Sequence, residues 1–168
     1  MSKKNIWTEK RFMNKIKVFF DTNVLIYAHD ESSIYHENSA NLLNLVFENQ
    51  ITGVIAEQNI IELYRILTNS VAMKNQPLTP QDVNKLITEV YLSGVFEVLY
   101  PNQLTTKKTL ELAVNSNCLS ARIFDVRLAG LVITYPVDYF ATYNIKHFLN
   151  IEGLNPMIPD DILSKIRL

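Results

Sequence analysis

The sequence predicts an α/β fold with a mostly parallel sheet, folded as one domain. Short apolar segments rich in β-branched and aromatic residues alternate along the chain with longer segments of helical periodicity. This alternation is typical of strand–helix–strand units. The length of 168 residues allows one sizeable hydrophobic core. The chain has neither an internal repeat nor a linker, so a second domain is not expected.

Four segments are expected to form strands, and each is short and mainly apolar. The first has four apolar residues in five and ends at the polar turn Asp21-Thr22-Asn23, which is typical of a central, buried strand. A short helix is expected directly after that turn. The predicted strands are residues 16–20, 51–55, 96–100 and 138–142.

Five longer segments carry apolar residues at helical spacing. They are residues 35–48, 57–70, 79–94, 104–117 and 121–133. Thr79 and Pro80 form a strong start signal for the third segment, and Gly94 marks its end. Three apolar faces are expected in the core: Ile60, Ile61, Tyr64 and Leu67; Val83, Leu86, Ile87, Val90 and Tyr91; and Phe124, Leu128, Leu131 and Val132. A dimer surface is the alternative role of the second face.

The two ends of the chain differ in composition from its centre. The first 17 residues carry six basic side chains and one acid, which predicts a solvated extension over residues 1–13, with a basic arm for RNA or a partner as the alternative. Beyond Gly153, Pro156 and Pro159 predict a mostly irregular segment. We therefore expect one domain over residues 14–158 and a tail over residues 159–168.

Composition excludes several classes of protein. Sixteen basic against seventeen acidic residues give a net charge of −1, so a polyanionic partner would need a local patch or metal ions. Cys118 is the single cysteine, which excludes an internal disulfide and a thiolate zinc site. No run of 18 apolar residues and no secretory signal are present, so we expect a cytoplasmic protein without a membrane span.

Three acids are candidates for chemistry, and each also has a structural explanation. Asp21 ends the predicted central strand, where open parallel sheets bind ligands in an exposed cleft, but it could simply cap the next helix. Glu62 adjoins an apolar helix face, and on this pattern alone a structural salt bridge is favoured. Asp125 lies near a helix start, where a negative charge is favourable in itself.

Oxygen ligands dominate the set of candidate residues. Asn144 follows the fourth predicted strand, where a simple turn residue is the alternative explanation. His147 is the one histidine of that region, which argues against zinc. If the three acids converge into one anionic pit, their oxygens suit Mg²⁺ or Mn²⁺, which take one or two carboxylates and keep water.

Several parts of the sequence, taken in order, resemble a known family. The segment KVFFDTNVLIYA at residues 17–28 resembles the opening of a PIN domain, and AHDESSIYHE at residues 28–37 fits the same group. The resemblance continues through Glu62, FDVRLAG at residues 124–130 and FATYNIKHF at residues 140–148. Order and spacing are similar to a compact prokaryotic PIN protein of the kind found as the VapC toxin of toxin–antitoxin modules.

The resemblance implies a single PIN domain with a central parallel sheet of four or five strands, acting as a metal-dependent endoribonuclease. Asp21, Glu62 and Asp125 would match the three core acids and hold Mg²⁺ or Mn²⁺. Asn144 would match the fourth position, which is often Asp, and Asn23 and Thr142 would support the site. An RNA substrate, a cognate antitoxin protein and a homodimer are implied in the same way.

Two other functions compete with this interpretation. The neutral Asn144 favours a PIN-fold module that binds RNA or protein and has lost its catalysis, whereas the three acids oppose it. A phosphotransfer protein also places an aspartate at a strand end, but a phosphatase of that kind needs an acid at position 23, which is Asn23. A receiver domain needs a pair of acids before its phosphorylated Asp, and no acid pair precedes Asp21.

Overall fold

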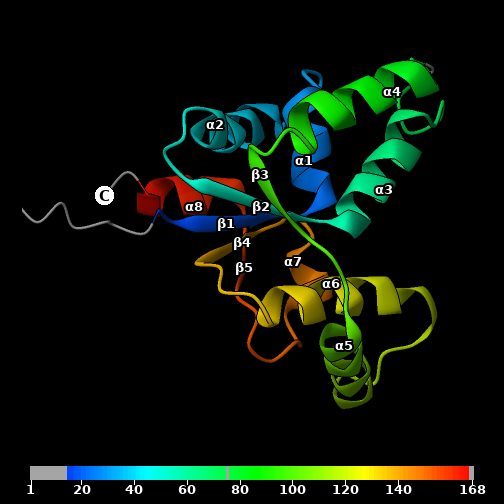
Figure 1. Ribbon diagram of the computed structural model, residues 1–168, viewed down its shortest axis with the longest axis vertical. Helices are drawn as coiled ribbons and strands as arrows, with labels where there is room; N and C mark the ends of the chain where they lie inside the picture. Colours follow the sequence, from blue (N-terminus) through cyan, green and yellow to red (C-terminus); the bar gives the residue numbers. More distant parts are fainter. Residues whose placement is uncertain (1–14, 75, 167–168) are drawn as a thin grey trace, which may run out of the picture.

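A parallel five-stranded sheet forms the centre of the computed structural model, which describes residues 15–74 and 76–166. The strands run in the order β3-β2-β1-β4-β5, and every neighbouring pair is parallel (Figure 1). They are β1 (Lys17–Phe20), β2 (Thr52–Ala56), β3 (Phe96–Leu99), β4 (Tyr139–Ala141) and β5 (Pro156–Met157). The α/β class and a sheet of four or five parallel strands are thereby confirmed.

Helices cover both faces of the sheet (Figure 1). One face carries α1 (Thr22–His29), α2 (His36–Phe47), α3 (Glu57–Leu67), α4 (Pro80–Leu86), the π-helical turn η1 (Ile87–Tyr91) and α8 (Pro159–Ile166). The other face carries α5 (Gln103–Asn115), the 3₁₀ turn η2 (Ser120–Arg122), α6 (Ile123–Ile133) and α7 (Ile145–Phe148). Within the described residues, no helix is both long and apolar enough to cross a membrane.

Strand β1 is buried on both faces because it lies in the middle of the sheet. Val18 and Phe20 enter the core beneath α1 and α2, whereas Phe19 enters the core beneath α6. Phe19 is in register with Val54 of β2 and with Phe140 of β4. The chain continues from β1 to β2 on one side, while β4 lies on the other, so β1 and β4 flank the point where the strand order reverses. Ligand sites of open α/β sheets lie beside that point.

The C-terminal segment is regular, so the expectation of a mostly irregular segment beyond Gly153 was wrong. Strand β5 pairs with β4, and α8 buries Ile162 and Leu163 in the core. Pro159 is the first residue of α8, where its missing N–H breaks no helical bond, and Asp160 follows in the first turn. The expected basic extension over residues 1–13 lies outside the described residues.

Two of the three expected helix faces differ in detail from the structure. Val83, Ile87 and Tyr91 are buried, as expected for a core face, so the alternative role of this face as a dimer surface was wrong. On α3, Leu63 is fully buried, whereas Ile61 and Tyr64 are exposed. On α6, Phe124 is 55% exposed although it was expected in the core stripe. Spacing alone does not distinguish the edge of a buried face from its centre.

Candidate metal centre

Polar side chains gather at the carboxyl edge of the sheet, where three adjacent strands end. Asp21 follows β1 and Thr142 follows β4, and the Asp21 N–H extends the ladder by donating to the Ala141 carbonyl oxygen over 2.9 Å. Helix α3 begins with Glu57 directly after β2. Since parallel strands end at a common edge, residues far apart in the chain become neighbours here.

Asp21 is buried at this edge, with only 6% of the residue exposed. Its Oδ1 accepts from the Thr22 N–H over 2.7 Å, and its Oδ2 accepts from Asn23 Nδ2 over 2.7 Å and from Thr142 Oγ1 over 2.6 Å. The expectation of an exposed cleft carboxylate was therefore wrong. The side chain does help to cap α1, but its bonds to Asn23 and Thr142 go beyond a cap.

Charge and burial act against ionisation of Asp21. Burial raises the pKa of Asp21 to about 6, the hydrogen bonds from Thr142 and Thr22 oppose this rise, and the negative charges of Glu62 and Asp125 add to it. A bound cation would relieve this cost, because it stabilises the ionised form.

Glu62, on α3, is clamped between two neutral donors. Thr22 Oγ1 donates to its Oε2 over 2.6 Å, and Gln58 Nε2 donates to its Oε1 over 2.9 Å. Thr22 itself accepts from Asn59 Nδ2 over 3.0 Å, which directs the Thr22 hydroxyl hydrogen toward Glu62. Within the described residues no lysine or arginine pairs with Glu62, so the salt bridge favoured by the residue pattern is not formed.

Asp125 lies in the first turn of α6 and is partly buried. Its Oδ2 lies 3.1 Å from His147 Nδ1, so the histidine of α7 is its direct partner. Burial raises the pKa of Asp125, the charge of His147 opposes this rise, and the charge of Glu62 adds to it. Hydrogen bonds place Glu62 between the other two acids, because Thr22 contacts both Asp21 and Glu62, and Gln58 contacts both Glu62 and the carbonyl oxygen of Phe124, the residue before Asp125.

The residues expected to support the site differ in how they contact it. Asn23 and Thr142 both donate to Asp21, and Asn23 Oδ1 also accepts the Tyr143 N–H over 3.1 Å. Asn144 is exposed, and its backbone N–H donates to Thr142 Oγ1 over 3.0 Å. Across the part of the chain that the structure describes, its side chain makes no hydrogen bond.

The acids are neighbours, but they do not form one compact pit. In residues 15–74 and 76–166, no three His, Cys, Asp or Glu side chains form a group that could hold a metal ion. The expectation of one anionic pit is therefore not met, and Thr22, Gln58 and His147 contact the carboxylates of Glu62 and Asp125 instead. The oxygen donors nevertheless suit a hard cation that is bound through one or two carboxylates and keeps its water.

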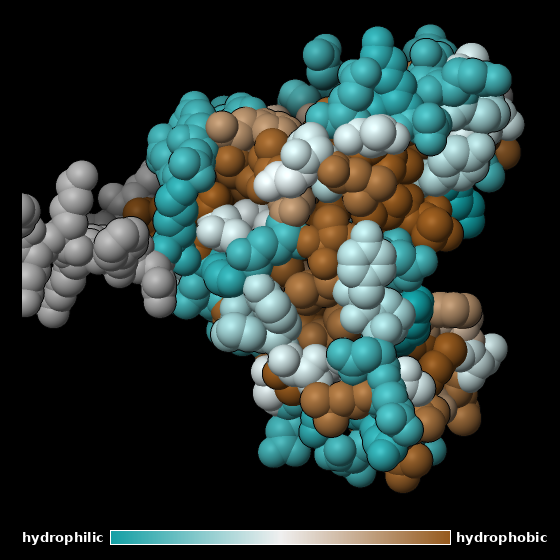
Figure 2. Space-filling view, viewed as in Figure 1, coloured by the Kyte–Doolittle hydropathy of each residue, from teal (hydrophilic) through white to brown (hydrophobic). Residues whose placement is uncertain are grey.

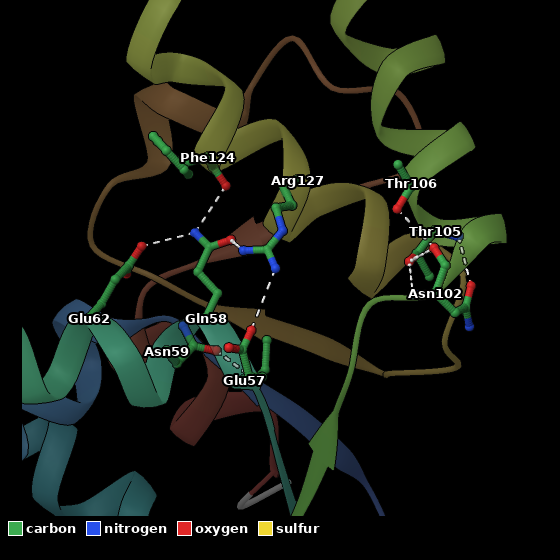
Figure 3. A network of polar contacts seen from close by, with 10 residues as sticks. Glu57, Gln58, Asn59, Glu62, Asn102, Thr105, Thr106, Phe124 and Arg127 are labelled. Carbon is green, nitrogen blue, oxygen red and sulfur yellow. Dashed lines mark hydrogen bonds and ion pairs between the residues drawn. The ribbon is translucent and has the colours of Figure 1, made fainter.

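Three residues of this network were missed in the sequence. Thr22 lies inside the polar turn after β1, and Gln58 precedes Glu62 by one helical turn. The sequence around both residues therefore indicated that they lie next to a candidate acid. Arg127, two residues after Asp125, had none, because its contacts with Gln58 and Glu57 join α6 to the distant α3 (Figure 3).

Two hollows adjoin the acids. One of about 510 Å³ beside Asp125 is lined by the cationic Arg122 and Lys146, together with His147 and Asn150. The other, of about 480 Å³, lies between α3 and α6, and Glu62 and Phe124 line it. In Figure 2, hydrophobic side chains reach the surface between the upper part of the molecule, with α3 and α4, and the lower part, with α5 and α6.

The structure is a parallel α/β fold with acids at the carboxyl edge of the sheet, beside the point where the strand order reverses. A family model described as PIN domain matches residues 17–126, which is more than half of the chain. The chain belongs to the PIN domain family.

Solved structures share the fold at low sequence identity. VapBC2 from Rickettsia felis bound to a promoter DNA fragment is 20% identical with a TM-score of 0.59, over 85% of this chain and 98% of that one. VapBC-1 from nontypeable Haemophilus influenzae is 17% identical with a TM-score of 0.58, over 86% and 99%. VapC20 of Mycobacterium tuberculosis, described as a Sarcin-Ricin loop cleaving toxin, is 10% identical with a TM-score of 0.59, over 79% and 93%. No curated protein matches the sequence.

Proposed function

We propose that this chain is a divalent-metal-dependent endoribonuclease and the toxin of a toxin–antitoxin pair. The observation that carries the proposal is the buried Asp21 with Glu62 and Asp125 as charged neighbours, at the point where the strand order reverses. Within the described residues no lysine or arginine pairs with any of the three. A buried acid without a cationic partner, such as Asp21, is typical of a site that binds a cation.

Asp21, Glu62 and Asp125 are the proposed ligands of Mg²⁺ or Mn²⁺, with the exposed Asn144 amide nearby. When bound, a divalent ion neutralises charge that develops on a phosphodiester and lowers the pKa of water at the site. The chain supplies the positioning: Thr142 and Thr22 hold Asp21 and Glu62 through their hydroxyl groups.

RNA is the proposed substrate, and the hollow beside Asp125 is the proposed contact for its phosphates. Arg122 and Lys146 line this hollow, so the chain offers local positive charge despite its net charge of −1. A phosphate next to the scissile one could bind there while the acids face the reacting group. We expect single-stranded or looped RNA, in which the backbone is accessible.

Cleavage of a structured RNA tests the proposal. We expect the protein to cut RNA with Mn²⁺ or Mg²⁺ and to stop cutting when a chelator is added. Asp125→Asn should lower the cleavage rate by roughly 100-fold or more. Removing a residue that supports a metal ligand lowers metal affinity or activity by about 10- to 100-fold, and removing the ligand itself should cost more. Asp161→Asn, an exposed acid on α8, is the control and should leave the rate unchanged. RNA binding without metal-dependent cutting would instead support the catalytically silent binding module, which the exposed, neutral Asn144 favours.

Two protein partners belong to the proposal. Toxin–antitoxin complexes among the structural relatives, such as that from Klebsiella pneumoniae, support a cognate antitoxin. A second copy of this chain is the proposed partner of the apolar surface on α5 and α6, where a hollow of about 240 Å³ is lined by the exposed Leu110 and Phe124. Apolar residues exposed together are typical of protein interfaces.

Light scattering on the purified protein tests the homodimer. We expect the wild type to have the mass of a dimer and Leu110→Lys to have the mass of a monomer, because a two-fold interface would place two lysine charges in an apolar contact. Val71→Lys, which changes another exposed apolar residue, is the control. A monomeric wild type would contradict the proposed dimer.

A further inference from the structure

Gln58 lies between two of the proposed ligands and contacts both of their helices. The residue is only 9% exposed. Its amide nitrogen donates to Glu62 Oε1 over 2.9 Å and to the Phe124 carbonyl oxygen of α6 over 3.1 Å (Figure 3). Its amide oxygen accepts from Arg127 Nη1 over 3.0 Å.

These contacts permit one orientation of the amide. Arg127 can only donate, so it requires the amide oxygen, whereas Glu62 and the Phe124 carbonyl can only accept and require the nitrogen. In a flipped amide, the Gln58 oxygen would face Glu62 and the Phe124 carbonyl oxygen, which are both acceptors. The Gln58 nitrogen would face Arg127, which can only donate. Arg127 is in turn held by Glu57, whose Oε2 lies 3.5 Å from Nη2. Gln58 therefore presents a fixed donor to Glu62.

The same bonds tie α3 to α6. Glu62 lies on α3, one turn after Gln58, and Asp125 lies on α6 between Phe124 and Arg127. Each bond from Gln58 to α6 reaches a residue within two positions of Asp125. The other oxygen of Glu62 is fixed by Thr22, so the Gln58 bond determines the rotation of the carboxylate.

We propose that Gln58 and Arg127 form a positioning clip that orients Glu62 relative to Asp125 and thereby sets the affinity of the site for a divalent cation. Both are positioning residues that act through Glu62, since neither offers an oxygen free of a partner to the cation. The inference rests on the proposed function, because it assumes that Glu62 and Asp125 are the ligands. Outer partners of this kind affect metal affinity strongly in other proteins.

Titration of the metal-free, full-length protein with Mn²⁺, with free Mn²⁺ followed by electron paramagnetic resonance, tests the clip. We expect Gln58→Met and Arg127→Met each to weaken Mn²⁺ binding by about 10-fold. The direction of the change in Mn²⁺ affinity for Arg127→Met is diagnostic. By Coulomb's law alone, removing a positive charge near a cation site would tighten Mn²⁺ binding, whereas loss of the clip would weaken it. Arg65→Met is the control. Arg65 lines the hollow between α3 and α6, as Gln58 and Arg127 do, but it makes no hydrogen bond to Gln58, so its removal should not weaken Mn²⁺ binding.

The double variant separates one clip from two independent contacts. Gln58→Met combined with Arg127→Met should bind Mn²⁺ no more weakly than either single variant, because both remove the same orientation of Glu62. Thermal unfolding confirms that each variant is folded. If one single variant does not fold, the Mn²⁺ affinity of the other single variant still tests the clip. Two results would overturn the clip in a wild type that still binds Mn²⁺ and cuts RNA. One is unchanged or tighter Mn²⁺ binding in a folded single variant. The other is a loss of affinity in the double variant that equals the product of the two single losses. A wild type that binds no Mn²⁺ would overturn both the clip and the proposed function.

Discussion

Asp21 combines a structural role with the proposed role of a metal ligand in one side chain. Its carboxylate accepts three hydrogen bonds and helps to begin α1, yet it is buried near two other acids. Each hydrogen bond favours the ionised form, and burial disfavours it more strongly. The residue therefore costs stability at neutral pH in the metal-free protein, which is a common property of residues kept for function.

Asp21→Asn tests this cost through the pH dependence of unfolding. The pKa of Asp21 is about 6 in the folded chain against 3.8 as the reference, so between these values the folded state binds more protons. Stability contributed by this group is thus present below pH 3.8 and is lost as the pH rises through 6. We expect the free energy of unfolding of the wild type, measured with denaturant and chelator, to fall relative to Asp21→Asn by roughly 2–3 kcal/mol between pH 4 and pH 7. A difference between the two proteins that is constant with pH would refute this explanation.

At the scale of elements, packing decided what local sequence signals left open. Strand positions and most helix starts agreed with the apolar patterns, because a buried central strand and an amphipathic helix have local signatures. The C-terminal helix differs from the expectation because prolines such as Pro156 and Pro159 indicate breaks in a local pattern, whereas Pro159 begins α8. The exposed Phe124 differed from expectation because the side of α6 toward α3 is left open as a hollow.

Ile162→Ala tests whether α8 is an integral part of the core. The Ile162 side chain is fully buried, so its truncation leaves a cavity and should lower the free energy of unfolding by about 2–5 kcal/mol. Leu149→Ala, at an exposed position, should cost much less. Urea denaturation of the two variants measures the difference, and equal small effects would show that α8 is dispensable.

At the scale of the whole molecule, charge is balanced overall and uneven locally. A net charge of −1 offers no general attraction for RNA, so binding of the proposed RNA substrate would have to come from the site itself. Arg122 and Lys146 gather positive charge in the hollow beside Asp125. Weak overall attraction combined with a local cationic hollow favours an RNA whose shape brings its phosphates to that hollow.

Lys146→Ala tests this distribution through salt dependence. If Lys146 contacts one phosphate, the variant should bind RNA more weakly, and the slope of log affinity against log salt should become smaller in magnitude by about 1. Binding is measured with catalytically inactive Asp125→Asn as the background, so that the RNA stays intact. Lys108→Ala, on α5, is the control, and an equal change of slope in both variants would argue against a role of this hollow.

The sequence by itself determined the α/β class, the order of the elements from β1 to β4 and the position of Asp21 at the end of the central strand, because hydrophobic periodicity and turn residues act over a few neighbours. The resemblance to the PIN family also implied that Asn23 and Thr142 support the site. Tertiary structure alone decided that Asp21 is buried, that Glu62 is clamped by Thr22 and Gln58, and that Arg127 joins α6 to α3. Those contacts span up to 70 positions in the chain, and their geometry depends on how whole helices pack on the sheet.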